Sequence, residues 1–130
     1  MIAQPDTRVM TICLLDDDPS VLKATGRLVA SAGWKVETFT DPTEFLRYAL
    51  ENQPAVAVID ILMPIMNGLE VQARLRSVSP TTGVIILTSK DDPSVRNQAV
   101  NAGAVGFFLK PANDCELLAA IETAMFGKFH

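Results

Sequence analysis

The sequence predicts a single α/β domain, a doubly wound (βα)5 fold in which helices cover both faces of a five-stranded parallel sheet. Short apolar runs alternate strictly with segments whose apolar residues recur at helical spacing, five of each. Strict alternation of strands and helices favours a parallel sheet with right-handed crossovers. The length of 130 residues suits one domain, and a hydrophobic fraction of 48% is enough to form a buried core.

Five segments are predicted to form strands. Four of them are largely apolar, as expected of strands that are buried on both faces, and they span residues 9–15, 55–59, 84–87 and 105–109. The remaining strand, residues 34–39, mixes polar and apolar side chains. This mixture predicts a position at an edge of the sheet, where less of a strand is buried.

Five helices are predicted from positions that share a face at helical spacing. In chain order these positions are Val21, Leu22, Thr25, Leu28 and Val29; Phe45, Leu46, Ala49 and Leu50; Val71, Leu75 and Val78; Val95, Ala99 and Ala102; and Leu117, Leu118, Ile121, Ala124 and Met125. Asp18, Asp41 and Asp92 each precede a proline, which predicts a capping acid followed by the first helical residue. Asn113 with Glu116 offers a similar start to the last helix.

Composition argues against several classes of function. The net charge is −4 and the basic residues form no stripe, so we expect no direct nucleic-acid binding by this chain. The apolar runs are far shorter than the roughly 18 residues of a membrane span, and the first residues lack the order of a signal peptide. Cys13 and Cys115 have no metal-site or disulfide-framework spacing, and Cys13 is predicted to lie in the core. We therefore expect a cytoplasmic domain without membrane contact.

Polar side chains follow four of the predicted strands at the point where each strand ends. They are Asp16 and Asp17 after the first strand, Asp60 after the third, Thr88 and Ser89 after the fourth, and Lys110 after the fifth. Ligands of open α/β sheets bind beyond the carboxyl ends of the strands. The sequence therefore predicts that these groups converge at one rim of the sheet.

The charges of this set predict a divalent cation. The carboxylates of Asp16, Asp17 and Asp60 and the ammonium of Lys110 together carry a net charge of −2, which is costly at a partly buried rim. A divalent ion would bring that charge to zero, and hard oxygen ligands favour Mg²⁺, with Mn²⁺ as a substitute. Such an ion would also offset the charge that develops when a phosphoryl group is transferred to Asp60.

Taken together, these residues resemble the receiver domain of two-component response regulators. The resemblance rests on "LLDDDPSVL", "VIDILMPIMNGLE", "IILTS" and "AGAVGFFLKP", which occur in the family's order and at compatible spacings. It covers residues 9–126, which leaves residues 1–8 as an N-terminal extension and residues 127–130 as a C-terminal tail. It implies the flavodoxin-like strand order 2-1-3-4-5.

Position by position, the resemblance also implies roles for the charged residues. Asp60 matches the phosphoacceptor, Asp17 the acid that binds Mg²⁺ directly, and Asp16 the acid that binds it largely through water. Lys110 matches the lysine that contacts the phosphoryl group, and its peptide bond to Pro111 is usually cis in this family.

Further residues match positions that surround the phosphoryl group in this family. Thr88 matches the switch hydroxyl, and Ser89 a position kept small because the phosphoryl group lies against it. Phe107 matches an aromatic residue that rotates inward as the hydroxyl moves. The backbone carbonyl of Leu62 matches a further metal ligand, and the Leu62 and Lys90 side chains occupy positions that tune the lifetime of the phosphorylated state. We expect these two side chains to prolong it.

The resemblance implies a signalling switch that is not an enzyme with an outside product. The phosphoryl donor would be a phosphohistidine on a sensor histidine kinase or a histidine phosphotransfer protein, and small acyl phosphates would substitute for it. Phosphorylation would change the face formed by the fourth helix, fifth strand and fifth helix, through which the domain would also form a homodimer.

Other functions fit the sequence less well. "DDDPS" also matches the nucleophile motif of haloacid-dehalogenase-like phosphatases with Asp16 as nucleophile, but this leaves "IDILMPIMNG" without a role. A non-phosphorylated pseudo-receiver that only binds partners would typically lack one of the acids or the lysine, and a flavodoxin would carry a phosphate loop after the first strand. "DDPSV" occurs at residues 17–21 and again at 91–95, and the second copy is interpreted as a loop and a helix cap.

Overall fold

Our computed structural model of the chain describes residues 10–126; the predicted extension 1–8, Val9 and the predicted tail 127–130 lie outside the described residues. Five parallel strands form one sheet in the order β2-β1-β3-β4-β5. In chain order the elements are β1 (Thr11–Leu15), α1 (Pro19–Ser31), β2 (Lys35–Phe39), α2 (Pro42–Asn52), β3 (Val56–Asp60), α3 (Gly68–Val78), β4 (Gly83–Thr88), α4 (Pro93–Asn101), β5 (Gly106–Leu109) and α5 (Asp114–Phe126). The predicted fold class and strand order are confirmed.

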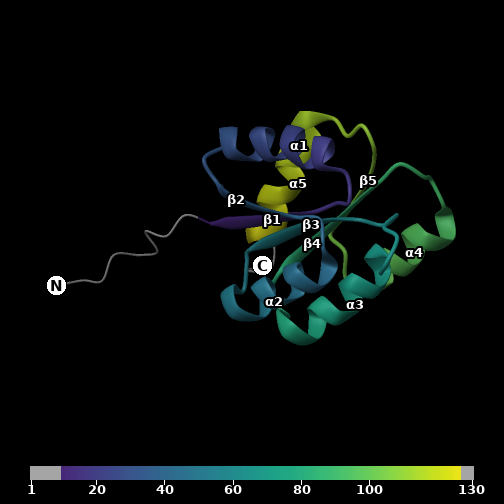
Figure 1. Cartoon of the computed structure of the whole chain (residues 1–130). Helices are drawn as coiled ribbons and strands as arrows, with labels where there is room; N and C mark the ends of the chain where they lie inside the picture. Colours follow the sequence, from purple (N-terminus) through teal and green to yellow (C-terminus); the bar gives the residue numbers. More distant parts are fainter. Residues whose placement is uncertain (1–9, 127–130) are drawn as a thin grey trace.

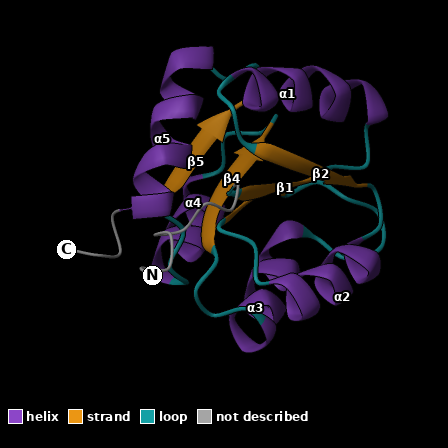
Figure 2. Ribbon diagram, turned by 90° about the vertical axis from the view of Figure 1, so that its left-hand side faces the viewer, coloured by secondary structure: helices purple, strands orange, loops and turns teal. Residues whose placement is uncertain are grey.

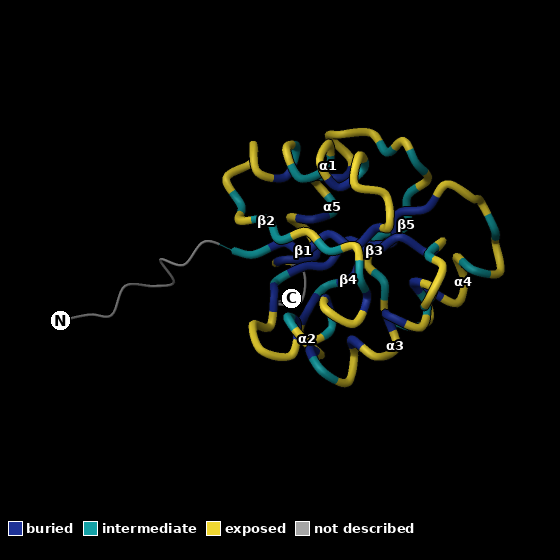
Figure 3. Tube along the Cα trace, viewed as in Figure 1, coloured by how far each residue is buried: buried dark blue, intermediate teal, exposed yellow. Residues whose placement is uncertain are grey.

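The helices form two layers, one on each face of the sheet. Helices α1 and α5 cover one face, while α2, α3 and α4 cover the other (Figure 1 and Figure 2). Each face has its own apolar core: Leu22 of α1 and Ile121 of α5 belong to one, and Phe45 of α2 and Leu75 of α3 belong to the other. The central strands therefore lie between two apolar layers, and Figure 3 shows them as the buried interior of the molecule.

The two edges of the sheet differ from its centre. The strand predicted at residues 34–39 is β2 and lies at an edge, as expected from its polar residues. The strand predicted at 105–109 was expected to be buried, but β5 forms the opposite edge and is only half-buried. Apolar side chains on and beside it stay accessible because β5 has a partner strand on one side alone: Val105, directly before β5, is 53% exposed and Leu109 40% exposed.

The helices begin where the sequence predicts. Four side chains each accept a hydrogen bond from a backbone N–H in the first turn of a helix: Asp18 from Ser20 at 2.9 Å, Asp41 from Thr43 at 2.9 Å, Asp92 from Ser94 at 3.0 Å, and Asn113 from Glu116 at 3.0 Å. One predicted core position is wrong: Leu50 is 57% exposed. The buried stripe of α2 runs through Phe45 and Ala49, and the next residue along the helix points about 100° away from it.

Residues 10–126 include no candidate membrane span. No helix in this part of the chain combines the length and the hydropathy that a spanning helix needs.

Candidate functional site

Strand ends bring the predicted polar residues to one rim of the sheet. Asp60 and Thr88 are the last residues of β3 and β4, and Asp16 and Lys110 directly follow β1 and β5. The strands are in parallel register, with Asp60 opposite Leu87. The backbone N–H of Lys110 donates to the carbonyl of Thr88 at 2.8 Å, which continues the ladder one residue beyond β5. Parallel pairing therefore fixes all four groups at the carboxyl ends of the strands.

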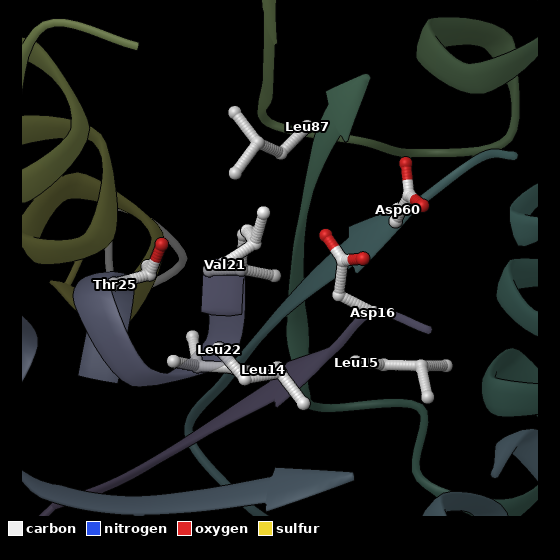
Figure 4. A pocket seen from close by; sticks show the side chains of 9 residues that line it. Leu14, Leu15, Asp16, Val21, Leu22, Thr25, Asp60 and Leu87 are labelled. Carbon is white, nitrogen blue, oxygen red and sulfur yellow. The ribbon is translucent and has the colours of Figure 1, made fainter. Parts of the chain in front are cut away.

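Three carboxylates meet at this rim. One oxygen each from Asp16, Asp17 and Asp60 lies within 4.8 Å of the others. Asp16 and Asp60 are buried, with 4% and 3% of their surface exposed, while Asp17 is exposed. Figure 4 shows the carboxyl groups of Asp16 and Asp60 beyond the ends of neighbouring strands. Three hard oxygen donors this close, one of them open to solvent, fit a small divalent cation such as Mg²⁺ or Mn²⁺.

Lys110 is the cationic member of the site. Its Nζ donates to Oδ2 of Asp16 at 2.6 Å and lies 3.5 Å from Oδ1 of Asp60. Burial by itself lowers the pKa of Lys110, but the hydrogen bond to Asp16 and the charges of Asp60 and Asp16 outweigh burial and raise it. Lys110 is therefore an ammonium ion at neutral pH, held between two carboxylates.

The surroundings of Asp60 disfavour its ionised form. Burial raises its pKa, and the neighbouring charge of Asp16 raises it further. The charge of Lys110 and the Leu62 N–H, which donates to Oδ1 at 3.4 Å, oppose this shift without cancelling it. The rim is thus short of positive charge even with Lys110 in place, which is the condition that a bound divalent cation would relieve.

Gly68 allows the loop after β3 to fold back against Asp60. A Cβ atom at position 68 would lie 2.5 Å from the carbonyl oxygen of Asp60 and 2.8 Å from Cα of Ile61, so a larger residue would displace the strand end. The Gly68 N–H donates to the Ile61 carbonyl at 3.0 Å. Sequence reasoning did not identify this close approach; the only signal was a glycine placed directly before a predicted helix.

The space beneath the carboxylates is too small for a substrate. A cavity of about 10 Å³ lies under Asp16 and Asp60, lined chiefly by apolar side chains that include Leu14, Leu22 and Leu87 (Figure 4). This is at the lower limit for a single water molecule. Any reacting group must therefore approach Asp60 from the open side of the rim.

The remaining predicted residues lie on the loops and strands around this rim. Thr88 is buried, and its Oγ1 accepts from the Lys90 N–H at 3.3 Å. Ser89 and Lys90 are exposed, and Leu62 is 47% exposed. Phe107 is half-buried on β5. The roles of these residues stay predictions.

The loop that follows Lys110 shows one feature that the resemblance implies. The Lys110–Pro111 peptide bond is cis.

Comparison with known proteins decides the family. The profile described as "Response regulator receiver domain" matches residues 12–122. The chain belongs to this family. It is 37% identical over 118 residues to the response regulator protein TodT of Pseudomonas putida, covering 91% of this chain and 52% of that protein. It is 36% identical over 115 residues to the tetrathionate response regulatory protein TtrR of Salmonella typhimurium, covering 88% and 56%. This receiver domain thus spans about half the length of these relatives.

Solved receiver domains share the fold. A CheY-like receiver domain protein from Methanospirillum hungatei superimposes with a TM-score of 0.88 at 25% identity, covering 94% of this chain and 98% of that one. The BeF3-activated DrrB receiver domain gives 0.82 at 29% identity, covering 91% and 98%. The predicted resemblance is confirmed, and it places the chain among the response regulators of two-component signalling.

Proposed function

We propose that this receiver domain accepts a phosphoryl group on Asp60, in the cytoplasm, from a phosphohistidine on a sensor histidine kinase or a histidine phosphotransfer protein. The single observation that carries the proposal is the cluster of Asp16, Asp17 and Asp60 within 4.8 Å, with Lys110 between two of its members. We take residues 9–126 as the functional domain.

The transfer step follows from the charge of Asp60 and from its position at the open side of the rim. A carboxylate oxygen of Asp60 attacks phosphorus, the P–N bond of the phosphohistidine breaks, and the imidazole leaves with the bonding electron pair and takes up a proton. Asp16, Asp17, Asp60 and the backbone carbonyl of Leu62 would hold Mg²⁺. When bound, this ion supplies the positive charge that offsets the growing negative charge on the phosphoryl oxygens.

Neighbouring residues complete the phosphoryl site. The ammonium of Lys110, 3.5 Å from Asp60, is placed to bind a phosphoryl oxygen. The hydroxyl of Thr88 turns from the Lys90 N–H toward another oxygen, and the small side chain of Ser89 leaves room for the group. These residues assist phosphorylation and dephosphorylation of the domain itself, and the domain releases no outside product as an enzyme would.

The output surface is the α4–β5–α5 face. As Thr88 moves, Phe107 turns inward, and this face changes shape and forms a receiver homodimer. Its support is the exposure of apolar side chains on and beside α4 and β5: Val100 is 52% exposed, Val105 53% and Leu109 40%. Exposed apolar groups of this kind are typical of protein interaction surfaces.

The lifetime of the phosphorylated state is set in part by Leu62 and Lys90. Leu62 is an exposed apolar side chain next to Asp60 and obstructs an attacking water, and Lys90 pairs with a phosphoryl oxygen. The variant Leu62→Asn/Lys90→Glu is therefore expected to lose its phosphoryl group faster than the wild type after the donor is removed. An unchanged decay rate would show that these side chains do not tune the lifetime.

Intact mass spectrometry tests the proposal. Incubation with acetyl phosphate and Mg²⁺ is expected to add one phosphoryl group to the wild type and none to Asp60→Asn, and chelation of the metal should prevent the addition. A wild type that stays unmodified would instead support a pseudo-receiver. Steady hydrolysis of a simple phosphate monoester would support the phosphatase-like alternative with Asp16 as the nucleophile.

A further inference from the structure

Helix α4 is attached to the domain by few apolar contacts. Ala99 is its one buried residue. Val95 packs, partly buried, against the same core as Ala99. Polar side chains of α3 supply further links, since Nε2 of Gln72 donates to the Ala99 carbonyl at 3.0 Å and Nη1 of Arg76 donates to the Ala102 carbonyl at 3.4 Å. A helix held in this way can change its position at a smaller cost than one packed into the core.

Arg96, in the first turns of α4, makes two contacts that join separate parts of the molecule. Its guanidinium carbon lies 5.1 Å from the centre of the Phe107 ring on β5. Its Nη2 lies 3.3 Å from Oδ1 of Asp91, in the loop between β4 and α4. One side chain thus connects the loop that follows Thr88 to the aromatic ring on β5.

The ring and the switch hydroxyl lie on the same face of the sheet. Phe107 pairs with Ile86 in the parallel ladder, and Thr88 lies two residues beyond Ile86 on β4. Side chains two residues apart on a strand point to the same face. Phe107 would therefore approach Thr88 along this face of the sheet, and turning in this way would change the position of its ring relative to the guanidinium, which lies 5.1 Å from the ring centre.

We infer that Arg96 is a positioning residue that retains Phe107 in its present orientation and so opposes the switch to the phosphorylated conformation. This inference rests on the proposed function, in which Phe107 turns toward Thr88. A guanidinium is attracted to the face of an aromatic ring, and Asp91 holds the guanidinium at the ring while the loop keeps its present course. When the ring turns inward this attraction is lost, while the pair between Arg96 and Asp91 does not depend on the ring.

Because conformation and ligand binding are thermodynamically linked, the effect of this contact can be measured as a change in the affinity for a phosphoryl analogue. Any interaction present only in the unphosphorylated conformation weakens the binding of a phosphoryl analogue by the same factor by which it favours that conformation. Removing Arg96 should therefore tighten the binding of beryllofluoride in the presence of Mg²⁺. The interaction free energy of an exposed cation–π contact corresponds to a change of about two- to fivefold in the dissociation constant for beryllofluoride.

The experiment measures beryllofluoride affinity of the full chain by NMR titration at saturating Mg²⁺. Arg96→Ala should bind more tightly than the wild type, and Arg96→Lys should lie between them because lysine keeps the charge without the flat guanidinium. Arg74→Ala, which removes an exposed arginine from α3, is the matched control and should bind like the wild type. Mere loss of stability in Arg96→Ala would weaken binding, so tighter binding distinguishes the positioning role from a structural one.

A double-mutant cycle with Phe107→Leu shows whether Arg96 acts through the ring. In the Phe107→Leu background, Arg96→Ala should leave the affinity nearly unchanged, because the contact that it removes no longer exists. The inference is overturned if Arg96→Ala binds no more tightly than the wild type, or if it has the same effect in both backgrounds. Failure of the wild type itself to bind beryllofluoride would overturn the proposed function, which is a separate outcome.

Discussion

At Asp60, burial and the charge of Asp16 act against ionisation, while Lys110 acts in favour of it. The net result is a pKa raised above its ordinary value of 3.8. Between the ordinary pKa, which holds in the unfolded chain, and the raised pKa of the folded state, the folded state binds more protons than the unfolded state. Without metal, the stability of the fold therefore falls as the pH rises through this window. Above the window, the anionic Asp60 destabilises the fold relative to a neutral side chain.

The variant Asp60→Asn tests this electrostatic balance. It removes the unfavourable charge while Lys110 keeps its 2.6 Å contact with Asp16. With a chelator present at pH 7, Asp60→Asn should unfold at a higher temperature than the wild type, and the difference should shrink as the pH is lowered toward 4 and the wild-type carboxyl takes up its proton. Thermal unfolding of both proteins over this range is the measurement. A wild type as stable as the variant at pH 7 would show that Lys110 outweighs burial.

Charged site residues could be predicted from the sequence, whereas the residues that support them could not. Asp16, Asp17, Asp60 and Lys110 follow strands, and the carboxyl ends of parallel strands must meet. The role of Gly68 depends on a close approach between two backbone segments that appears only once the loop is folded. Gln72 and Arg96 are ordinary helix-surface residues in the sequence, and their contacts depend on where α4 lies.

Among the elements, the repeated "DDPSV" segments show how one local pattern serves two purposes. In both copies the second aspartate caps a helix, Asp18 for α1 and Asp92 for α4, as the capping pattern predicts. The first aspartates differ, because Asp17 joins the carboxylate cluster and Asp91 pairs with Arg96. Capping is local and therefore predictable, while the partner of the first aspartate depends on which strand precedes it.

Removing the caps should affect stability without affecting phosphorylation. Asp18→Ala and Asp92→Ala are each expected to lower the free energy of unfolding by about 1 kcal/mol, since the first leaves the Ser20 N–H, and the second the Ser94 and Val95 N–H groups, without their acceptor. Chemical denaturation measures this change, and both variants should still be phosphorylated by acetyl phosphate.

Asp17→Asn should give the opposite pattern, with little change in stability and loss of metal-dependent phosphorylation. A cap variant that cannot be phosphorylated would mean that its aspartate belongs to the site.

For β5 and α2, the burial of individual side chains was predicted less well than the existence of the element. An apolar run indicates a strand but not how many partners cover it, so β5 was expected to be buried and is half-exposed. In α2 the apolar pattern includes Leu50, and only the orientation of the helix on the sheet decides that Phe45 and Ala49 are buried instead. Strand order was likewise implied by resemblance to a family, because periodicity does not contain it.

For the whole molecule, the carboxylate cluster couples metal binding to stability. An ion that binds only the folded chain stabilises it, by about 1.4 kcal/mol when its concentration is about ten times the dissociation constant. Mg²⁺ should therefore raise the unfolding temperature of the wild type in a saturable way. Asp17→Asn should lose this response, because Asp17 is the exposed ligand whose replacement leaves the buried pair of Asp16 and Lys110 intact. An equal Mg²⁺ response in both proteins would place the ion elsewhere.

The acceptor residue can be located directly by chemical trapping. Borohydride reduces an aspartyl phosphate to homoserine, which tandem mass spectrometry of peptides can assign to a position. After phosphorylation with acetyl phosphate and Mg²⁺, we expect homoserine at position 60 and at no other aspartate. Homoserine at position 16, or none at all in a chain that has gained a phosphoryl group, would contradict the assignment of Asp60 as the phosphoacceptor.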